Sequence, residues 1–196
     1  PGQRVAAMRA LAAASYPESM APIASLLTDP IDDIQLEAID TLLAFVVTDQ
    51  VAKLRRVALV VEVRNRKRAQ DVFDRGPFAL LPRPVVPEVV NGLAAAMRDD
   101  AVRVRVDATY ALGVLARPPV AGAAIDALAT ALRDPDKDVR LAAARVAGGL
   151  RAAALGDALI EAVNDRAQPV RVAAMLALGD IRETRAVQAL TQQLEF

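Results

Sequence analysis

The chain contains no cysteine, no histidine and no tryptophan, and aromatic residues make up only 3% of its 196 residues. Without cysteine there can be no disulfide framework and no thiolate nucleophile. Without histidine as well, the usual imidazole base and the ordinary kinds of zinc site are excluded. Sites built from carboxylates alone remain open, but no loop has the ligand spacing of a calcium site. We therefore expect neither a metal site nor a cofactor.

Long apolar runs and an excess of one charge are also missing. Twenty-four basic residues balance 24 acidic residues, so neither a globally basic nucleic-acid binder nor an acidic disordered chain is expected. The apolar stretch from Val57 to Val63 is interrupted by Glu62 and is far shorter than the roughly 20 residues that span a bilayer. The sequence thus predicts no transmembrane segment, leaves the compartment open and slightly favours the cytoplasm. A start at Pro1 rather than Met leaves open a processed product or a piece of a larger protein.

The chain is rich in small and medium-sized apolar residues that recur in a fixed pattern. Apolar residues make up 54% of the chain, mostly Ala, Leu and Val, which favours closely packed helices. The string RVAAM occurs at both Arg4–Met8 and Arg171–Met175. The clearest unit begins at Asp134, and its apolar residues have the spacing of one helix face: Val139, Ala143, Val146, Ala147 and Leu150. Four other segments keep this spacing, which indicates a repeat protein.

These five segments, which we name A helices, each need a second helix to cover the apolar face. The intervals supply such B helices, again with apolar residues at helical spacing: Met20, Ile23 and Leu27; Val90, Leu93 and Met97; Ile125, Leu128 and Leu132; Leu155, Leu159 and Val163; Val187, Leu190 and Leu194. The predicted fold class is all-α, an α-solenoid (superhelix) of stacked antiparallel helix pairs. We expect a single array over residues 1–196, with repeats at about 1–28, 29–98, 99–133, 134–164 and 165–196.

Three residue types recur in columns of the repeat. An aspartate ends four of the B helices, an arginine follows six positions after three of them, and a glycine recurs in the A helices. The members are Asp29, Asp99, Asp134 and Asp165; Arg105, Arg140 and Arg171; and Gly113, Gly148 and Gly179. A binding surface of alternating charge is one interpretation, but we favour helix capping by Asp and pairing between repeats by Arg. The glycines are expected to permit close helix contact.

The unit that begins at Asp134 resembles the HEAT-like repeats of the short bacterial type named after phycobilisome (PBS) lyases. The residues that carry the resemblance are Asp134, Pro135, Val139, Arg140, Ala143 and Gly148. The resemblance covers roughly 3–45 and 86–194, and it implies stacked helix pairs. The family includes lyase subunits, scaffolds and regulators, so it implies a fold more specifically than a function.

Residues 48–85 interrupt the pattern between the second A helix and its B helix. This segment carries nine of the basic residues of the chain. We favour a degenerate repeat, with Val51–Val63 as a B helix and Arg66–Arg75 as a shortened A helix, over a projecting insertion, because stacked units tolerate sequence drift. The basic residues are candidates for binding an anion, namely Arg55, Arg56, Arg64, Arg66, Lys67 and Arg68. A solvated helix end is the alternative.

The favoured function is a non-catalytic scaffold that binds a protein or peptide partner. If the usual arrangement of the family holds, the partner meets polar side chains of the B helices on a concave face: Glu88, Asn91, Asp126, Thr130, Asp157, Glu161, Arg185, Gln188 and Gln192. Binding of nucleic acid or another polyanion through the basic segment is an alternative, and it predicts an affinity that falls steeply with salt. A bilin lyase-type subunit is a second alternative, which rests on the resemblance alone.

Overall fold

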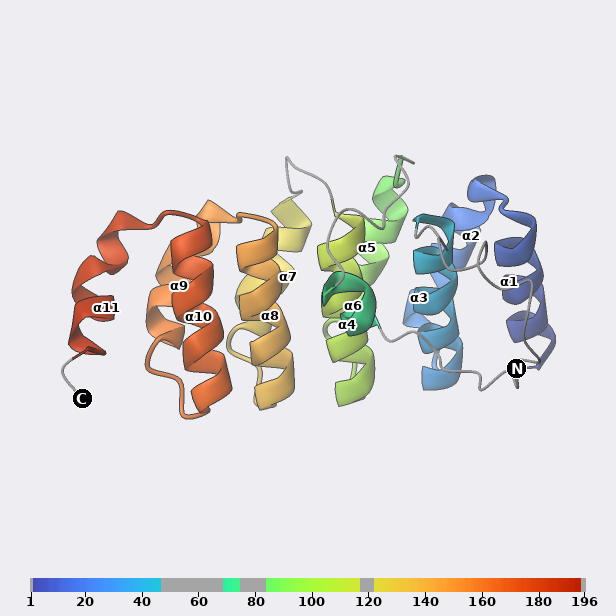
Figure 1. Cartoon of the computed structure of the whole chain (residues 1–196). Coiled ribbons are helices and arrows are strands. Elements are labelled where there is room, and N and C mark those ends of the chain that lie inside the picture. The colour runs from blue at the N-terminus through green and yellow to red at the C-terminus, as the bar shows by residue number, and fades with distance from the viewer. Residues whose placement is uncertain (1, 47–68, 75–83, 117–121, 195–196) are drawn as a thin grey trace, which may run out of the picture.

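The computed structural model describes residues 2–46, 69–74, 84–116 and 122–194. Helices stand side by side in one elongated row, with the two ends of the chain at opposite ends of the row (Figure 1). The described residues form helices and no strands. The prediction of an all-α solenoid is therefore confirmed.

The helices form two layers, and the front layer in Figure 1 contains the A helices. These are α1 (Gly2–Ala14), α3 (Asp32–Val46), α6 (Val102–Leu115), α8 (Lys137–Gly149) and α10 (Gln168–Asp180). The B helices are α2 (Met20–Ala24), α5 (Pro87–Ala96), α7 (Gly122–Ala131), α9 (Gly156–Ala162) and α11 (Val187–Gln192). Short 3₁₀ turns adjoin three of them: η1 (Pro17–Ser19) and η2 (Ser25–Thr28) at α2, η5 (Ala153–Leu155) at α9 and η6 (Thr184–Ala186) at α11.

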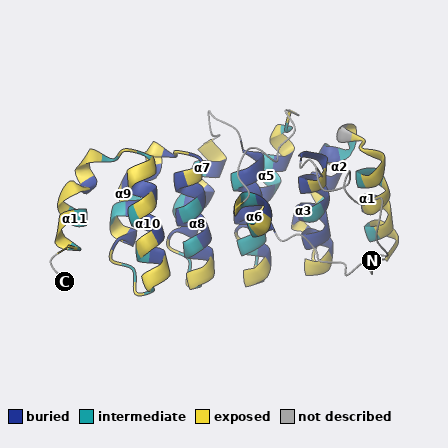
Figure 2. Ribbon diagram, in the orientation of Figure 1, coloured by how far each residue is buried: buried dark blue, intermediate teal, exposed yellow. Residues whose placement is uncertain are grey.

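The core is a continuous apolar layer between the A and B helices. In α8, Val139, Ala143 and Val146 are fully buried, as their spacing predicts. Leu128 of α7 and Leu159 of α9 are also fully buried and come from the B side. Figure 2 shows buried residues along the middle of the row, whereas α1 and α11 are mostly exposed. Each inner helix is thus covered by neighbours on both sides, as a one-dimensional stack requires.

The first and last helices depart from the predicted pattern. In α1, Ala7 and Ala10 stand at the repeat positions of the core residues Ala143 and Val146, but both are exposed. Met8 is buried instead. In α11, no residue is buried, and Val187 is 63% exposed. The reason is that α1 packs against α3 as its one A-layer neighbour, so a small rotation of α1 exchanges the buried positions without opening a gap elsewhere. None of the helices in the described part of the chain has the length and apolar character that crossing a membrane needs.

The aspartate column closes the turns that precede the A helices. The Asp134 carboxylate accepts a hydrogen bond from the N–H of Asp136 over 2.8 Å, and that of Asp165 accepts from Ala167 over 2.7 Å. Asp29 and Asp99 make the same turn. The prediction of helix capping needs a correction, because the N-cap residue of α8 is Asp136, whose side chain accepts from the N–H of Asp138. The column residue stabilises the turn before that cap.

The arginine column joins neighbouring repeats at Arg105 and Arg140, as predicted, whereas Arg171 donates to the carbonyl oxygens of Asp165 and Arg166 just before its own helix. Arg140 donates two hydrogen bonds, of 2.7 and 2.9 Å, to the Asp165 carboxylate, and a third nitrogen donates to the carbonyl oxygens of Asp134 and Pro135. Arg105 contacts Asp134 in the same two-pronged way, over 2.9 and 3.0 Å. Bidentate pairs of this kind fix geometry as well as charge. The alternating charges are therefore a device that sets the spacing of the stack.

The interrupting segment leaves the row of A helices continuous. Helices α3 and α6 pack directly against each other, and the described helix of the segment, α4 (Ala69–Asp74), lies against α6 and also touches α3. In Figure 1, α4 stands in front of α6 rather than in the row. Residues 66–75 were expected to hold a shortened A helix, but α4 does not stand between two A helices. The expected B helix, Val51–Val63, lies outside the described residues, and the division of the chain into repeats stays a prediction.

Candidate functional site

The predicted partner-binding residues lie on the B side of the stack. All nine are exposed, and they come from α5, α7, α9, η6 and α11: Glu88, Asn91, Asp126, Thr130, Asp157, Glu161, Arg185, Gln188 and Gln192. We name this set the B-face row. The structure thus places them on the elements that the sequence assigned, while their role in binding stays a prediction.

Ion pairs within the B-face row and its surroundings neutralise part of its negative charge. Arg133 contacts Glu161 over 2.6 Å, and Arg185 contacts Asp157 over 2.8 Å, so each pair joins one B element to the next. Arg185 also donates side-chain and backbone hydrogen bonds to Glu183, which lower the pKa of that carboxyl to about 2. Because these groups are exposed, the pairs contribute little to stability. Their consequence is that two of the four carboxylates of the row are neutralised locally.

The predicted anion-binding residues cannot be placed on any surface. Arg55, Arg56, Arg64, Arg66, Lys67 and Arg68 all lie outside the described residues. The hypothesis that they bind a polyanion therefore stays a prediction. Within the described ranges, no three His, Cys, Asp or Glu side chains are grouped as a metal ion would need.

The A side carries a feature that was not predicted, the docking of α4 through Phe73. The Phe73 ring lies over two glycines, since a Cβ atom added to Gly113 would come 2.8 Å from the ring and one added to Gly149 would come 3.0 Å from it. The ring centroid is 5.5 Å from that of Tyr110, at a tilt of 48°. A side chain at either glycine would displace the ring. Gly113 therefore serves to hold α4, as well as allowing α8 to approach.

Arg145 of α8 completes this contact. Its guanidinium donates to Asp74 of α4 over 2.7 Å and to the Tyr110 hydroxyl over 3.3 Å. It also lies 5.9 Å from the Phe73 ring centroid and 5.8 Å from that of Tyr110, within the range of cation–π attraction. Burial raises the pKa of Tyr110 above its ordinary value. The negative charge of Asp74 on α4 is thus paired with the positive charge of Arg145 on α8.

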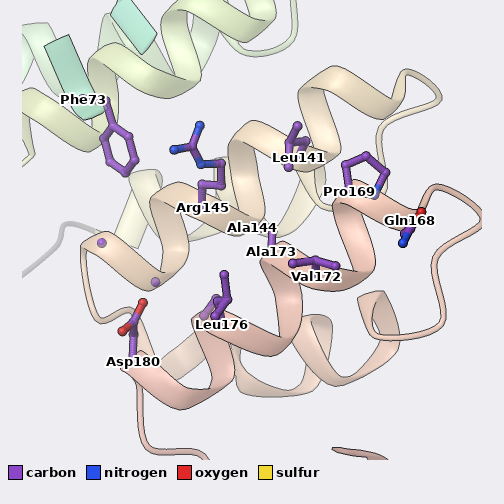
Figure 3. Close-up of a pocket in the computed structure, with 13 residues that line it drawn as sticks. Phe73, Leu141, Ala144, Arg145, Gln168, Pro169, Val172, Ala173, Leu176 and Asp180 are labelled. Atoms are coloured by element: carbon purple, nitrogen blue, oxygen red, sulfur yellow. The ribbon is translucent and has the colours of Figure 1, made fainter. Parts of the chain in front are cut away.

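A groove of about 560 Å³ lies beside this contact, between α8 and α10 (Figure 3). We name it the A-face groove. It is lined by Phe73, Leu141, Ala144, Arg145, Gly148, Gly149, Gln168, Pro169, Val172, Ala173, Leu176, Ala177 and Asp180. Two of its apolar side chains are prominent on the surface, because Leu176 is 67% exposed and Val172 is 48% exposed. Exposed aliphatic side chains that share one concave surface are typical of an interaction site.

The sequence held one signal for this groove. Val172 and Leu176 stand one helical turn apart on the outer side of α10, away from the predicted core positions. An apolar pair on the outer side of a surface helix is unusual and favours a contact. No comparable signal pointed to Phe73, because its neighbours on α6 and α8 are remote in sequence.

Comparison with known proteins finds similarity in the C-terminal part of the chain. Residues 125–195 match the family model of HEAT repeats. No curated protein matches the chain. Human deoxyhypusine hydroxylase, solved in complex with glycerol, is 20% identical, with a TM-score of 0.45 over 90% of this chain and 66% of that chain. An engineered protein is 19% identical, with a TM-score of 0.46 over 91% of this chain and 84% of that chain.

The chain spans slightly less than two thirds of the length of the hydroxylase chain. The family match covers α7 almost entirely and all of α8 to α11. These helices include the most regular part of the stack, with the Arg140–Asp165 pair and the A-face groove. The helix pairs within residues 125–195 match the HEAT-repeat model, on a chain whose described part is an α-solenoid.

Proposed function

We propose that the protein is a non-catalytic scaffold of the short bacterial PBS-lyase HEAT-like type, which binds a protein or peptide partner through the B-face row. HEAT repeats generally serve as protein-interaction scaffolds. The observation that carries the proposal is that nine polar side chains from successive B elements are all exposed on the same layer. Bidentate Arg–Asp pairs on inner turns hold neighbouring repeats in fixed register. A row held this rigidly loses little conformational entropy when it binds.

The proposal places the centre of the contact on α5 and α7. Among the described residues, Glu88 and Asp126 make no ion pair, whereas Asp157 and Glu161 are paired with arginines. Carboxylates without a cationic neighbour attract a basic partner and speed its association. The expected partner therefore presents Lys or Arg side chains to this part of the row.

A charge-reversal experiment tests the proposal. The variant E88R/D126R is compared with D71R/D100R, which makes the same change in net charge at exposed carboxylates outside the row. Each protein, linked to beads through one terminus, is used to capture partners from extract of the source cells, and bound proteins are quantified by mass spectrometry. A partner that the parent protein and D71R/D100R retain, and that E88R/D126R loses by about tenfold, supports the proposal. Equal retention by all three proteins contradicts it.

A further inference from the structure

The repeat relates the A-face groove to the place where α4 is bound. A shift of 35 residues aligns α6 with α8, so Tyr110 and Gly113 correspond to Arg145 and Gly148, and a shift of 31 residues aligns α8 with α10. On the opposite wall, Arg145, Val146 and Gly149 correspond to a set that also lines the groove: Leu176, Ala177 and Asp180. The residues that surround Phe73 thus have a counterpart, one repeat further along, in which no described segment lies.

We propose that the A-face groove binds a short amphipathic helix of a partner protein, which presents one aromatic side chain and, next to it, one basic side chain. The bound helix lies one repeat along from α4 and packs beside it. This site lies on the opposite layer from the B-face row and does not depend on the function proposed for that row.

The choice of a helix rests on the way in which the chain fills the preceding position. There, a helix of six residues is held by one ring placed over Gly113 and Gly149. The A-face groove also offers an apolar surface, since Leu176 and Val172 are exposed on one side, while Gly148 packs against Ala177 and Asp180 at its floor. Helix-in-groove recognition uses such apolar anchors spaced by one turn. Phe73 itself lines the groove, so the bound helix would extend an existing contact.

The choice of a basic side chain rests on two residues that differ between α8 and α10 at equivalent positions of the repeat. Where α8 has Arg145, which pairs with Asp74 of α4, α10 has Leu176 and offers no cation. Where α8 has Gly149, α10 has Asp180, whose carboxylate oxygen would lie 3.0 Å from a Cβ atom added to Gly148. Figure 3 shows Asp180 at the end of the groove, on the same side as Leu176. Arg145 also lines the groove, but its guanidinium is paired with Asp74, so Asp180 sets a charge preference that is the reverse of the one that α4 satisfies.

The test uses a synthetic peptide as the probe. It is an alanine-based helical peptide of about 15 residues, long enough for an isolated helix to be marginally stable, with a fluorescein label. It carries Phe and Leu one turn apart and Lys beside the Phe. A second peptide has Asp in place of the Lys, and a third has Ala in place of the Phe. Binding to the full chain is measured by fluorescence anisotropy.

Two variants of the groove have matched controls on the B side. L176D is compared with V187D, because both residues are prominently exposed aliphatic side chains. D180K is compared with E18K, which makes the same charge change at an exposed residue outside the B-face row. Circular dichroism verifies the folding of each variant, and V172D replaces L176D if that variant fails to fold.

The expected result is that the parent protein prefers the Lys peptide over the Asp peptide by about tenfold, and that D180K reverses this preference. L176D and the loss of Phe each weaken binding about tenfold or more, whereas V187D and E18K leave it unchanged. Absence of saturable binding, equal binding of the three peptides, or equal effects of the groove and control variants would overturn the proposal. So would sedimentation showing that the groove joins two copies of the chain and that L176D separates them.

Discussion

Two junctions in the row of A helices use the same position of the repeat in different ways. At the junction of α8 with α10, Arg140 donates two hydrogen bonds to Asp165 and two more to backbone carbonyl oxygens. At the junction of α3 with α6, the residue in that position is Gln35, which donates one hydrogen bond of 2.8 Å to Asp99. The Gln35 Oε1 atom is buried and has no hydrogen-bond partner. In the sequence, the interrupting segment lies between the two helices of this second junction.

The difference shows how the stack continues across a long interruption of the sequence pattern. Gln35 and Asp99 are 64 residues apart, yet they make the contact that elsewhere joins residues 25 or 29 apart. Stacking depends on contacts between neighbouring units rather than on chain length between them. The junction therefore keeps its geometry, but one hydrogen bond from a neutral amide to the Asp99 carboxylate replaces a bidentate pair with a guanidinium, which is the stronger of the two. We infer that the interrupted junction contributes less to stability than the regular one.

The largest expected effect comes from removing the charged pair. Arg140→Ala would leave the Asp165 carboxylate, whose side chain is 10% exposed, without its cation, and two carbonyl oxygens without their donor. Breaking a buried pair in this way costs about 3–5 kcal/mol. Gln35→Ala should cost about 1–3 kcal/mol, because it removes one hydrogen bond to the Asp99 carboxylate and an already unpaired oxygen. Urea denaturation followed by circular dichroism measures both.

The order of these two values decides the comparison. If Gln35→Ala destabilises the protein as much as Arg140→Ala, the two junctions are energetically equivalent and the inference is wrong. Exposed Arg103→Ala is the control for loss of an arginine from an A helix, since its contact with Asp107 is at 4.0 Å on the surface. It should change stability by less than about 1 kcal/mol.

The comparison also shows which parts of the molecule the sequence predicts. Periodic apolar spacing predicts the inner helices well, because Val139 and Val146 can be buried in one orientation of α8 only. The columns likewise predict the Asp–Arg pairs, because each member recurs at a fixed offset. Identical strings do not guarantee identical environments, however: Met8 and Met175 close the two RVAAM strings, but Met8 is 2% exposed and Met175 is only partly buried. The end helix has one A-layer neighbour, so its rotation is set by packing that the string does not encode.

The site was less predictable than the fold, for a related reason. The exposed B-face row follows from helical spacing alone. The contact of Phe73 with Gly113 and Gly149 brings together residues that belong to no common column, since Phe73 lies in the irregular segment. The three glycines of the column have different surroundings. Gly113 lies under the Phe73 ring, and a Cβ atom added to Gly148 would come 3.0 Å from Ala177 of α10. A Cβ atom added to Gly179 would meet nothing within 4 Å. The repeat therefore predicts where each glycine stands on its helix, but the residues that pack on it determine what it does.

A smaller effect is expected when α4 is released from the stack. Phe73→Ala removes the ring that covers Gly113 and Gly149 and that packs on Tyr110. Truncation of a buried Phe costs about 3–5 kcal/mol, and this half-buried ring should cost about 2 kcal/mol. Urea denaturation gives the value, and limited proteolysis should show faster cleavage near α4 than elsewhere. Unchanged stability together with unchanged cleavage would show that the ring does not anchor the segment.

A gain of about 1 kcal/mol is expected from Gln35→Arg, which gives the interrupted junction the residue of the regular one. The introduced guanidinium can contact the Asp99 carboxylate with two nitrogens, as Arg105 contacts Asp134. It also removes the unpaired oxygen of Gln35. The same measurement on Gln35→Met, which has no donor, separates the pair from the effect of side-chain length. Destabilisation by the arginine would mean that α3 and α6 are spaced differently from the regular helices.

The smallest expected effect is a dependence of stability on pH at the regular junction, where the acceptor carboxylate is paired with a guanidinium. The hydrogen bonds from Arg140 hold the pKa of Asp165 below its ordinary value of 3.8, against the opposing effect of burial and with help from the N–H of Ala167. A carboxyl with a lowered pKa in the folded state stabilises that state above its unfolded pKa. This contribution is complete near neutral pH, and it is lost as the pH falls through 3.8 towards the folded pKa.

Asp165→Asn removes the titrating group and keeps the shape of the acceptor. Urea midpoints of the parent protein and of this variant, measured at about pH 6, 4 and 3, should differ most at the highest pH and converge at the lowest. Arg140→Ala should show the same convergence, because the lowered pKa depends on the guanidinium. Parallel curves for the parent protein and Asp165→Asn would mean that the pair contributes through packing and hydrogen bonds alone. The regular junction would then differ from the interrupted one in the number of its bonds and not in its charge.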